Sequence, residues 1–232
     1  MQRRKFTALL SVFTGLWGLP GASRAANLSE LDATSAVRVA LERGALAAVG
    51  LLGKTDGFLG NPKVRIPLPG FLNDAAKLLK ATGQQRRVDE LVTAMNRAAE
   101  AAMPEAKTLL VSAVKAMSVD DAVKVIKGGD NSVTQFFGDK TREPLGVKFL
   151  PIVTQATEKV SLAAKYNSLA SKASSLGLLK KEDANIEQYV SGKALDGLFL
   201  MIGEEERKIR KDPVGTGSAI LKKVFGSLKQ GG

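Results

Sequence analysis

Residues 192–211 read GKALDGLFLMIGEEERKIRK, and apolar residues recur among them every three or four positions. An α-helix has about 3.6 residues per turn, so this spacing places the apolar side chains on one side of a helix. A helix with one apolar side needs other elements against which to bury it. The stretch therefore predicts a helix inside a helical domain, with an apolar stripe of Leu195, Leu198, Phe199, Ile202 and Ile209.

The same spacing extends outward from this stretch to about Leu28, and few segments alternate as strands do. Gly83, Pro104 and Gly128 interrupt it and are expected to separate helices. We expect an all-α fold, a single-domain multi-helix bundle over residues 27–232 without internal repeats. Its helices are expected at residues 29–52, 71–82, 86–102, 105–117, 120–127, 143–171, 181–189, 192–211 and 216–228, with a turn at 174–177.

Two helix starts carry recognisable capping residues. Ser118 is followed three positions later by Asp121, the spacing of a capping box, so the acidic pair at 120–121 is read as a helix start rather than a catalytic dyad. Asp130 is expected to cap a further short helix that holds Phe136 and Phe137.

Residues 54–70 contain three glycines and three prolines and cannot form a helix. Within them Val64, Ile66 and Leu68 alternate with other residues, which predicts an extended Pro/Gly-rich arm with one apolar edge. Connections of this length in a domain are usually functional or laid against something. Two interpretations stay open: an arm packed over its own core, or an arm laid against a partner.

Residues 1–26 have the three parts of a cleavable signal peptide. A basic start that includes Arg3 and Arg4 precedes an apolar stretch, which is too short to span a bilayer comfortably, and the segment ends in the small residues Ala25 and Ala26. The arginine pair also fits the twin-arginine export signature, although such pairs occur by chance in general secretory signals. We therefore expect a periplasmic, soluble protein, with the export route and a retained membrane anchor left open.

The composition excludes several kinds of chemistry. The chain contains no Cys and no His, which excludes disulfides, a lipoprotein cysteine, Ser-His-Asp catalysis and ordinary zinc sites. We expect no cofactor and no metal, and an enzyme is disfavoured. Without the four basic residues of the first 26, 30 basic and 23 acidic residues remain, a net charge of +7 instead of +11. The basic residues are spread out and aromatics are 5% of the chain, so no nucleic-acid partner is expected.

The expected helix at 86–102 places polar residues beside its apolar stripe. Asn96 and Glu100 lie on the flank of the stripe, one helical turn apart, and Arg97 is expected to point to the opposite side. The two flanking residues either hydrogen-bond each other at a helix boundary or face a ligand. We retain Asn96 and Glu100 as candidate ligand-binding residues.

The opening stretch contains a sharper anomaly, because Glu206 falls near the centre of its apolar stripe and Arg210 falls at the edge. The acid precedes the base by four residues, the favourable order for a helical ion pair. A carboxylate buried without a partner would cost several kcal/mol, so a nearby arginine is physically required. The pair is either a buried structural salt bridge or the polar wall of a cavity that binds a head group.

Several ordered segments together resemble a known family. They are Ile66-Pro67-Leu68-Pro69, then Met95 to Glu100, then Asp121-Ala122 through Gly128, and finally Glu205 to Pro213 followed by Val224-Phe225-Gly226. With these segments the chain resembles the bacterial domain-of-unknown-function family 4197. The resemblance covers nearly all of the mature chain and implies an exported, helical protein without assigned activity. It supplies no catalytic residues.

Three functions follow as hypotheses. The first is a non-enzymatic periplasmic binding or interaction protein that presents or encloses an apolar surface for a lipid-like ligand or an envelope partner. The basic helix expected at 216–228 either docks on its own domain or lies on an anionic membrane surface. The second is a carboxylate-based hydrolase or lyase using Glu100 or Glu206, and the third is a purely structural envelope protein. The oligomeric state is left open.

Overall fold

The computed structural model describes residues 22–70, 77, 81, 83, 85–129, 131–158, 163, 164, 166, 167 and 185–212, with side chains from residue 34 onward. These residues form five helices and no strand, which confirms the all-α fold. The helices are α1 (Ala22–Leu52), α3 (Gln85–Lys115), α4 (Val119–Lys127), α5 (Ser132–Thr157) and α7 (Ile186–Lys211). In this described part of the chain, no helix combines the length and hydropathy needed to cross a membrane.

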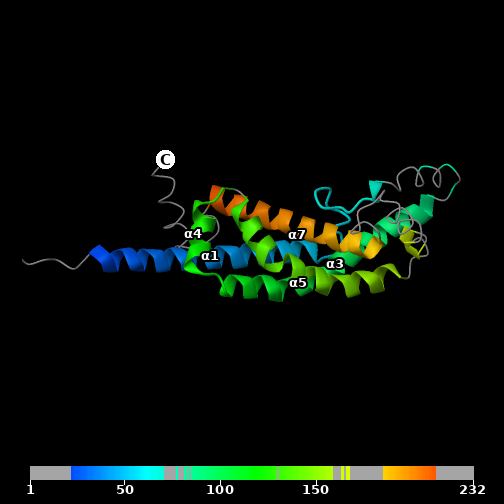
Figure 1. Cartoon of the computed structure of the whole chain (residues 1–232). Helices are drawn as coiled ribbons and strands as arrows, with labels where there is room; N and C mark the ends of the chain where they lie inside the picture. The colour runs from blue at the N-terminus through cyan, green and yellow to red at the C-terminus, as the bar shows by residue number, and fades with distance from the viewer. Residues whose placement is uncertain are drawn as a thin grey trace, which may run out of the picture.

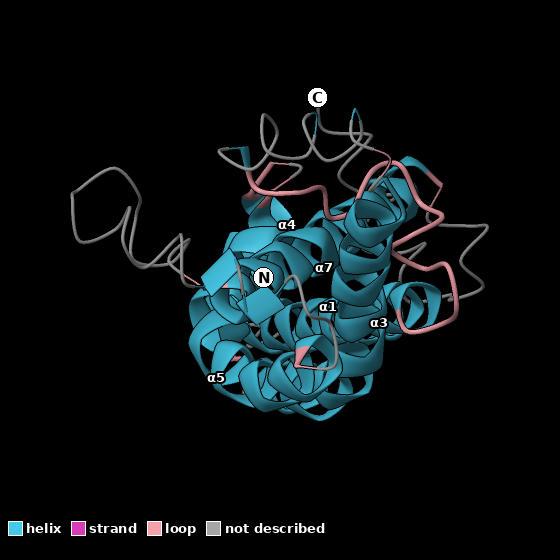
Figure 2. Ribbon diagram, turned by 90° about the vertical axis from the view of Figure 1, so that its right-hand side faces the viewer, coloured by secondary structure: helices cyan, strands magenta, loops and turns pink. Residues whose placement is uncertain are grey.

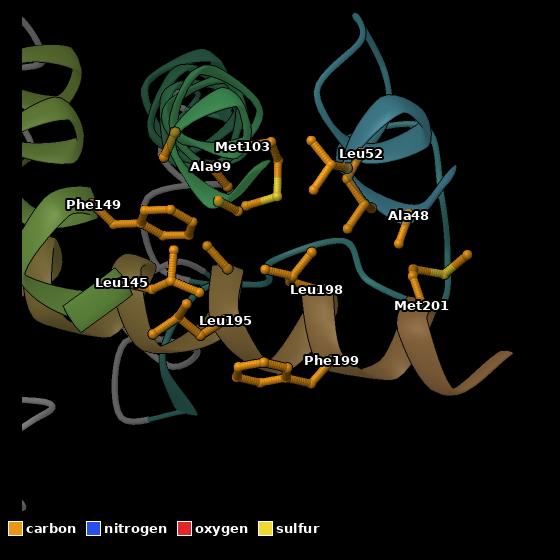
Figure 3. Close-up of a cluster of buried hydrophobic side chains, with 14 of the residues drawn as sticks. Ala48, Leu52, Ala99, Met103, Leu145, Phe149, Leu195, Leu198, Phe199 and Met201 are labelled. Atoms are coloured by element: carbon orange, nitrogen blue, oxygen red, sulfur yellow. The ribbon is translucent and has the colours of Figure 1, made fainter. Parts of the chain in front are cut away.

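The long helices run lengthwise along the molecule, and the short α4 lies at the end of the bundle where α7 ends (Figure 1). Seen end-on, the helices surround a common interior (Figure 2). One hydrophobic core occupies this interior and takes residues from every described helix. Figure 3 shows part of it, with side chains that meet from α1, α3, α5 and α7, among them Leu52, Met103, Phe149 and Leu198.

Two predicted helix breaks are wrong, because the helices continue through them. Pro104 lies inside α3, where its missing N–H costs the hydrogen bond to the Glu100 carbonyl. Ala102, Met103 and Ala106 around it are fully buried, and this packing outweighs the loss. Similarly, α7 begins at Ile186 and passes through Gly192 without interruption.

The ends of two other helices also differ from prediction. A single helix, α5, begins after Asn131 and replaces the expected short helix and the start expected at 143. It ends at Thr157 rather than at 171. The hydroxyl groups of Thr154 and Thr157 donate to carbonyls one turn earlier, which weakens a helix where it ends. The prediction for Asp130, most of the helix at 71–82, the turn at 174–177, the helix at 216–228 and residues 1–21 lie outside the described residues.

The predicted capping box at the start of α4 is confirmed. The Ser118 hydroxyl accepts from the Asp121 amide at 3.1 Å, and the Asp121 carboxylate accepts from the Ser118 amide at 3.1 Å. Two otherwise unpaired amides of the first turn are thereby satisfied.

Residues 53–69 are irregular and lie against the helices. Phe58, Val64 and Ile66 point into the core, and Phe58 and Ile66 are completely buried. The arm approaches α7 so closely that a Cβ at Gly197 would lie 2.8 Å from the Phe58 ring. A glycine in the middle of a helix is unfavourable, so its place here is explained by this close approach.

Candidate functional site

Asn96 binds the backbone of the arm. Its side chain is completely buried, and its Oδ1 accepts from the Ile66 amide at 2.8 Å while its Nδ2 donates to the Ile66 carbonyl at 2.9 Å. The same Nδ2 donates to the Val92 carbonyl at 2.8 Å. A single amide side chain thus satisfies both backbone groups of one buried arm residue.

Glu100 binds the arm one helical turn further along α3. Its Oε1 accepts from the amides of Phe58 and Leu59 at 3.0 and 3.1 Å. Its Oε2 accepts from Arg97 at 2.6 Å, and Arg97 also binds Asp56 at 2.7 Å. These two carboxyl groups raise the pKa of the Arg97 guanidinium, through the hydrogen bond with Glu100 first and the one with Asp56 second.

Two expectations about this helix are corrected by these contacts. Asn96 and Glu100 do not hydrogen-bond each other; each binds backbone groups of the arm instead. Arg97 does not point to the opposite side, because its long side chain bends back to reach Glu100 and Asp56. Tyr189 of α7, which no sequence pattern marks as a binding residue, donates its hydroxyl to the Pro67 carbonyl at 3.1 Å. We call Asn96, Arg97, Glu100 and Tyr189 the arm clamp.

The structure also contains the ion pair expected in α7. Arg210 donates to the Glu206 carboxylate at 2.8 Å through Nε and at 2.7 Å through Nη2. The Glu206 side chain is 4% exposed and that of Arg210 is 19% exposed. The carboxylate is therefore buried, and the guanidinium is in limited contact with solvent.

The pair also binds the ends of two other helices. At the end of α4, Arg210 donates to the Val125 carbonyl at 2.8 Å, and at the start of α5 Glu206 accepts from the Val133 amide at 3.3 Å. Ser132 lies between them, accepting from Arg210 at 2.9 Å and donating at 3.0 Å to the Val125 carbonyl and at 3.2 Å to Glu206. The cation meets the negative end of one helix and the anion the positive end of another, which favours both contacts.

Glu206 and Arg210 line a pocket that Asn96 and Glu100 do not border. We call it the α1–α7 pocket. It has a volume of about 20 Å³, which is room for about one water molecule. The surface that faces the pocket is apolar throughout. The lining residues include Val37 and Leu41 of α1, Val125 of α4, Val133 of α5, and Ile202 and Ile209 of α7.

The four candidate residues thus form two separate sets. The hydrogen bonds given above join the arm clamp to residues 56–67 and to Val92, whereas those of the Glu206–Arg210 pair go to Val125, Ser132 and Val133. The polar groups of Asn96 and Glu100 are used on the protein's own backbone, whereas the second pair borders empty space. Within the same residues, acidic side chains do not gather in threes that would hold a metal ion.

Burial raises the pKa of the Glu206 carboxyl above its ordinary value, because removal from water disfavours the carboxylate. The hydrogen bonds from Arg210, Ser132 and the Val133 amide act in the opposite direction. The folded protein therefore holds a proton at Glu206 at a pH where the unfolded chain has already lost it. The stability gained this way is present in full below the unfolded pKa and is lost as pH rises through the folded pKa.

Replacing Glu206 with glutamine is expected to remove this part of the pH dependence. The unfolding free energy of the wild type minus that of Glu206→Gln should fall as the pH rises above the ordinary pKa of a glutamate carboxyl, as measured by urea unfolding. Asp121→Asn is the opposite control. Hydrogen bonds from Ser118 lower the pKa of Asp121. The unfolding free energy of the wild type minus that of Asp121→Asn should therefore rise with pH in the acid range. If the difference between the wild type and Glu206→Gln also rose with pH, burial would not raise the pKa of Glu206.

Comparison with protein families gives one match. The family described as Protein of unknown function (DUF4197) matches residues 27–226. The chain belongs to the DUF4197 family. This confirms the resemblance seen in the sequence, and the match covers all of α3, α4, α5 and α7 and most of α1, so both sets of residues lie within DUF4197. No curated protein and no solved structure matches the chain.

Proposed function

We propose that the protein is a non-enzymatic periplasmic binding protein that takes an apolar, lipid-like ligand, or the apolar part of an envelope partner, at the α1–α7 pocket. The observation that carries this proposal is an apolar pocket bordered by the buried ion pair of Glu206 and Arg210. Ligand sites typically combine apolar walls with a few polar groups that orient the ligand. The signal-like residues 1–26 support the periplasmic location.

The size of the pocket adds a condition to this proposal. A space for about one water molecule does not hold an acyl chain, so a ligand enters only if one wall moves. The Glu206–Arg210 pair is already neutral as a whole, so the polar end of the ligand is expected to be a neutral group that accepts a hydrogen bond. A second carboxylate beside Glu206 would be repelled.

The carboxylate-based hydrolase or lyase is less well supported. Glu100 already accepts from two amides and from Arg97, which leaves it little capacity to act on a substrate. Glu206 borders the pocket and remains the only one of the two with a place for a substrate. Substituting each with glutamine and screening a broad substrate panel tests the enzyme: turnover abolished by either substitution in a folded protein would support it.

Native mass spectrometry of protein purified from its own host tests the binding proposal. We expect an added mass on the wild type, and an Ala40→Leu variant, which fills the pocket from α1, should carry it at least about tenfold less often. Val39→Leu is the matched control, because Val39 is the neighbouring residue on α1 but is 36% exposed and does not line the pocket. Repeated absence of any added mass, or equal loss in both variants, would overturn the proposal.

A further inference from the structure

Among the helices that line the pocket, α4 buries the fewest side chains. It has nine residues, and only Ala122 and Val125 among them are buried. Gly128 and Gly129 follow it directly, and nothing lies within 4 Å of the position of a Cβ at Gly129. A short element with few buried apolar side chains and a glycine connection opens more easily than the rest of a domain.

Hydrogen bonds hold the C-terminal end of α4 against α5 and α7. The Val125 carbonyl lies in the last turn of α4, where carbonyls lack partners within the helix. It accepts from Arg210 at 2.8 Å and from Ser132 at 3.0 Å. At the other end, Arg38 of α1 donates to the Met117 carbonyl at 2.5 Å, just before α4 begins.

Val125 also borders the pocket. The Val125 side chain lines the α1–α7 pocket, while its carbonyl binds Arg210 and Ser132 beside it. A larger open hollow of about 700 Å³ borders the connection between α4 and α5, lined by Gly128, Gly129 and Ser132 among others. The connection borders open space at Gly129, whereas Gly128 packs closely against Ser132. A displacement of α4 would therefore turn about Gly129 and would join the small pocket to this hollow.

We propose that α4 is a hinged lid over the α1–α7 pocket, and that the Val125 carbonyl occupies the place on Arg210 and Ser132 that the ester carbonyl of a bound acyl chain takes when the lid lifts. Lifting α4 removes one acceptor from Arg210, which borders the pocket, and from Ser132 beside it. An ester carbonyl restores that acceptor without adding charge beside Glu206, and its acyl chain replaces the Val125 side chain against Val37, Leu41 and Ile202. This inference rests on the proposed function for its ligand but not for its motion.

The motion is tested by thiol labelling, for which the chain is well suited because it contains no cysteine. Val125→Cys and Ala122→Cys each place a thiol on the buried side of α4. Ala99→Cys is the matched control, because Ala99 lies on α3 and is completely buried. In folded protein, verified by circular dichroism, we expect the α4 thiols to react at least about tenfold faster than the α3 thiol. Ser132→Ala should speed labelling at Val125→Cys further. Equal rates at α4 and α3 would overturn the lid, whether or not the protein binds lipid.

The ligand chemistry is tested on the wild type by hydrogen exchange of the α4 amides. Monolaurin and lauroyl lysophosphatidylglycerol both carry an ester carbonyl, whereas laurate carries a carboxylate. We expect both esters to raise exchange in α4 and leave α3 unchanged, with laurate having less effect. No effect of either ester, or an effect of the phospholipid alone, would overturn ester recognition. The proposed function is tested by a different result: it is overturned if native mass spectrometry of the protein purified from its host repeatedly shows no added mass.

Discussion

Replacing Asn96 with alanine is expected to lower the unfolding free energy by about 2–5 kcal/mol. The substitution removes three hydrogen bonds and leaves the buried amide and carbonyl of Ile66 without partners. Each unpaired buried group costs about 1–3 kcal/mol, and the lost volume adds a cavity. The loss should appear in urea unfolding and as a fall in Tm of roughly 5–15 °C for a chain of this size.

The same variant should release the arm before the helices unfold. Lys63 and Arg65 are exposed residues of the arm, so limited trypsin digestion at these positions reports its detachment. Asn61→Ala is the matched control, because Asn61 lies in the same arm but its side chain accepts only an exposed hydrogen bond from Lys63. Equal stability and equal cleavage of the two variants would show that Asn96 does not hold the arm.

Replacing Arg210 with methionine is expected to cost about 3–5 kcal/mol at neutral pH. The substitution leaves the Glu206 carboxylate, only 4% exposed, without its cation. It also removes the donor that serves the Val125 carbonyl at the end of α4. Urea unfolding measures the effect, which should shrink at lower pH because the uncompensated Glu206 then takes up a proton.

A double-mutant cycle separates the charge from the packing. Glu206→Met combined with Arg210→Met should recover much of the lost stability, because it replaces a buried pair with apolar side chains of similar volume. Lys208→Met is the control for an exposed pair: Lys208 binds Glu205 at 2.6 Å but is 64% exposed, so it should cost no more than about 1 kcal/mol. A double variant that is less stable than Arg210→Met alone would contradict the assignment of the cost to a stranded carboxylate.

The helices were predictable where a local pattern determined them. The capping box at Ser118 and Asp121 involves residues three apart, so the sequence contains all of its parts. The breaks expected at Pro104 and between residues 189 and 192 are absent, because the energy that overrides a local helix break comes from distant partners. Local propensity is worth a few kcal/mol at most, and buried apolar packing exceeds it.

The candidate site was predictable in part for the same reason. Glu206 and Arg210 are four residues apart on one helix, and their pairing follows from helical geometry and from the cost of a buried charge. Asn96 and Glu100 were correctly placed as inward polar residues, but their partners lie 30 and about 40 residues earlier in the chain. No periodicity within α3 contains that information.

The sequence by itself determined that the chain is helical, that its family is DUF4197, and that α7 carries an ion pair within its apolar stripe. These properties depend on neighbours within one or two helical turns, or on ordered motifs along the chain. Only the tertiary structure decided that Asn96 and Glu100 hold the arm, and that Glu206 and Arg210 join the ends of α4 and α5 beside a pocket. Backbone amides and carbonyls are the partners in each case, and because every residue carries them, the amino-acid sequence does not mark which ones a side chain will meet.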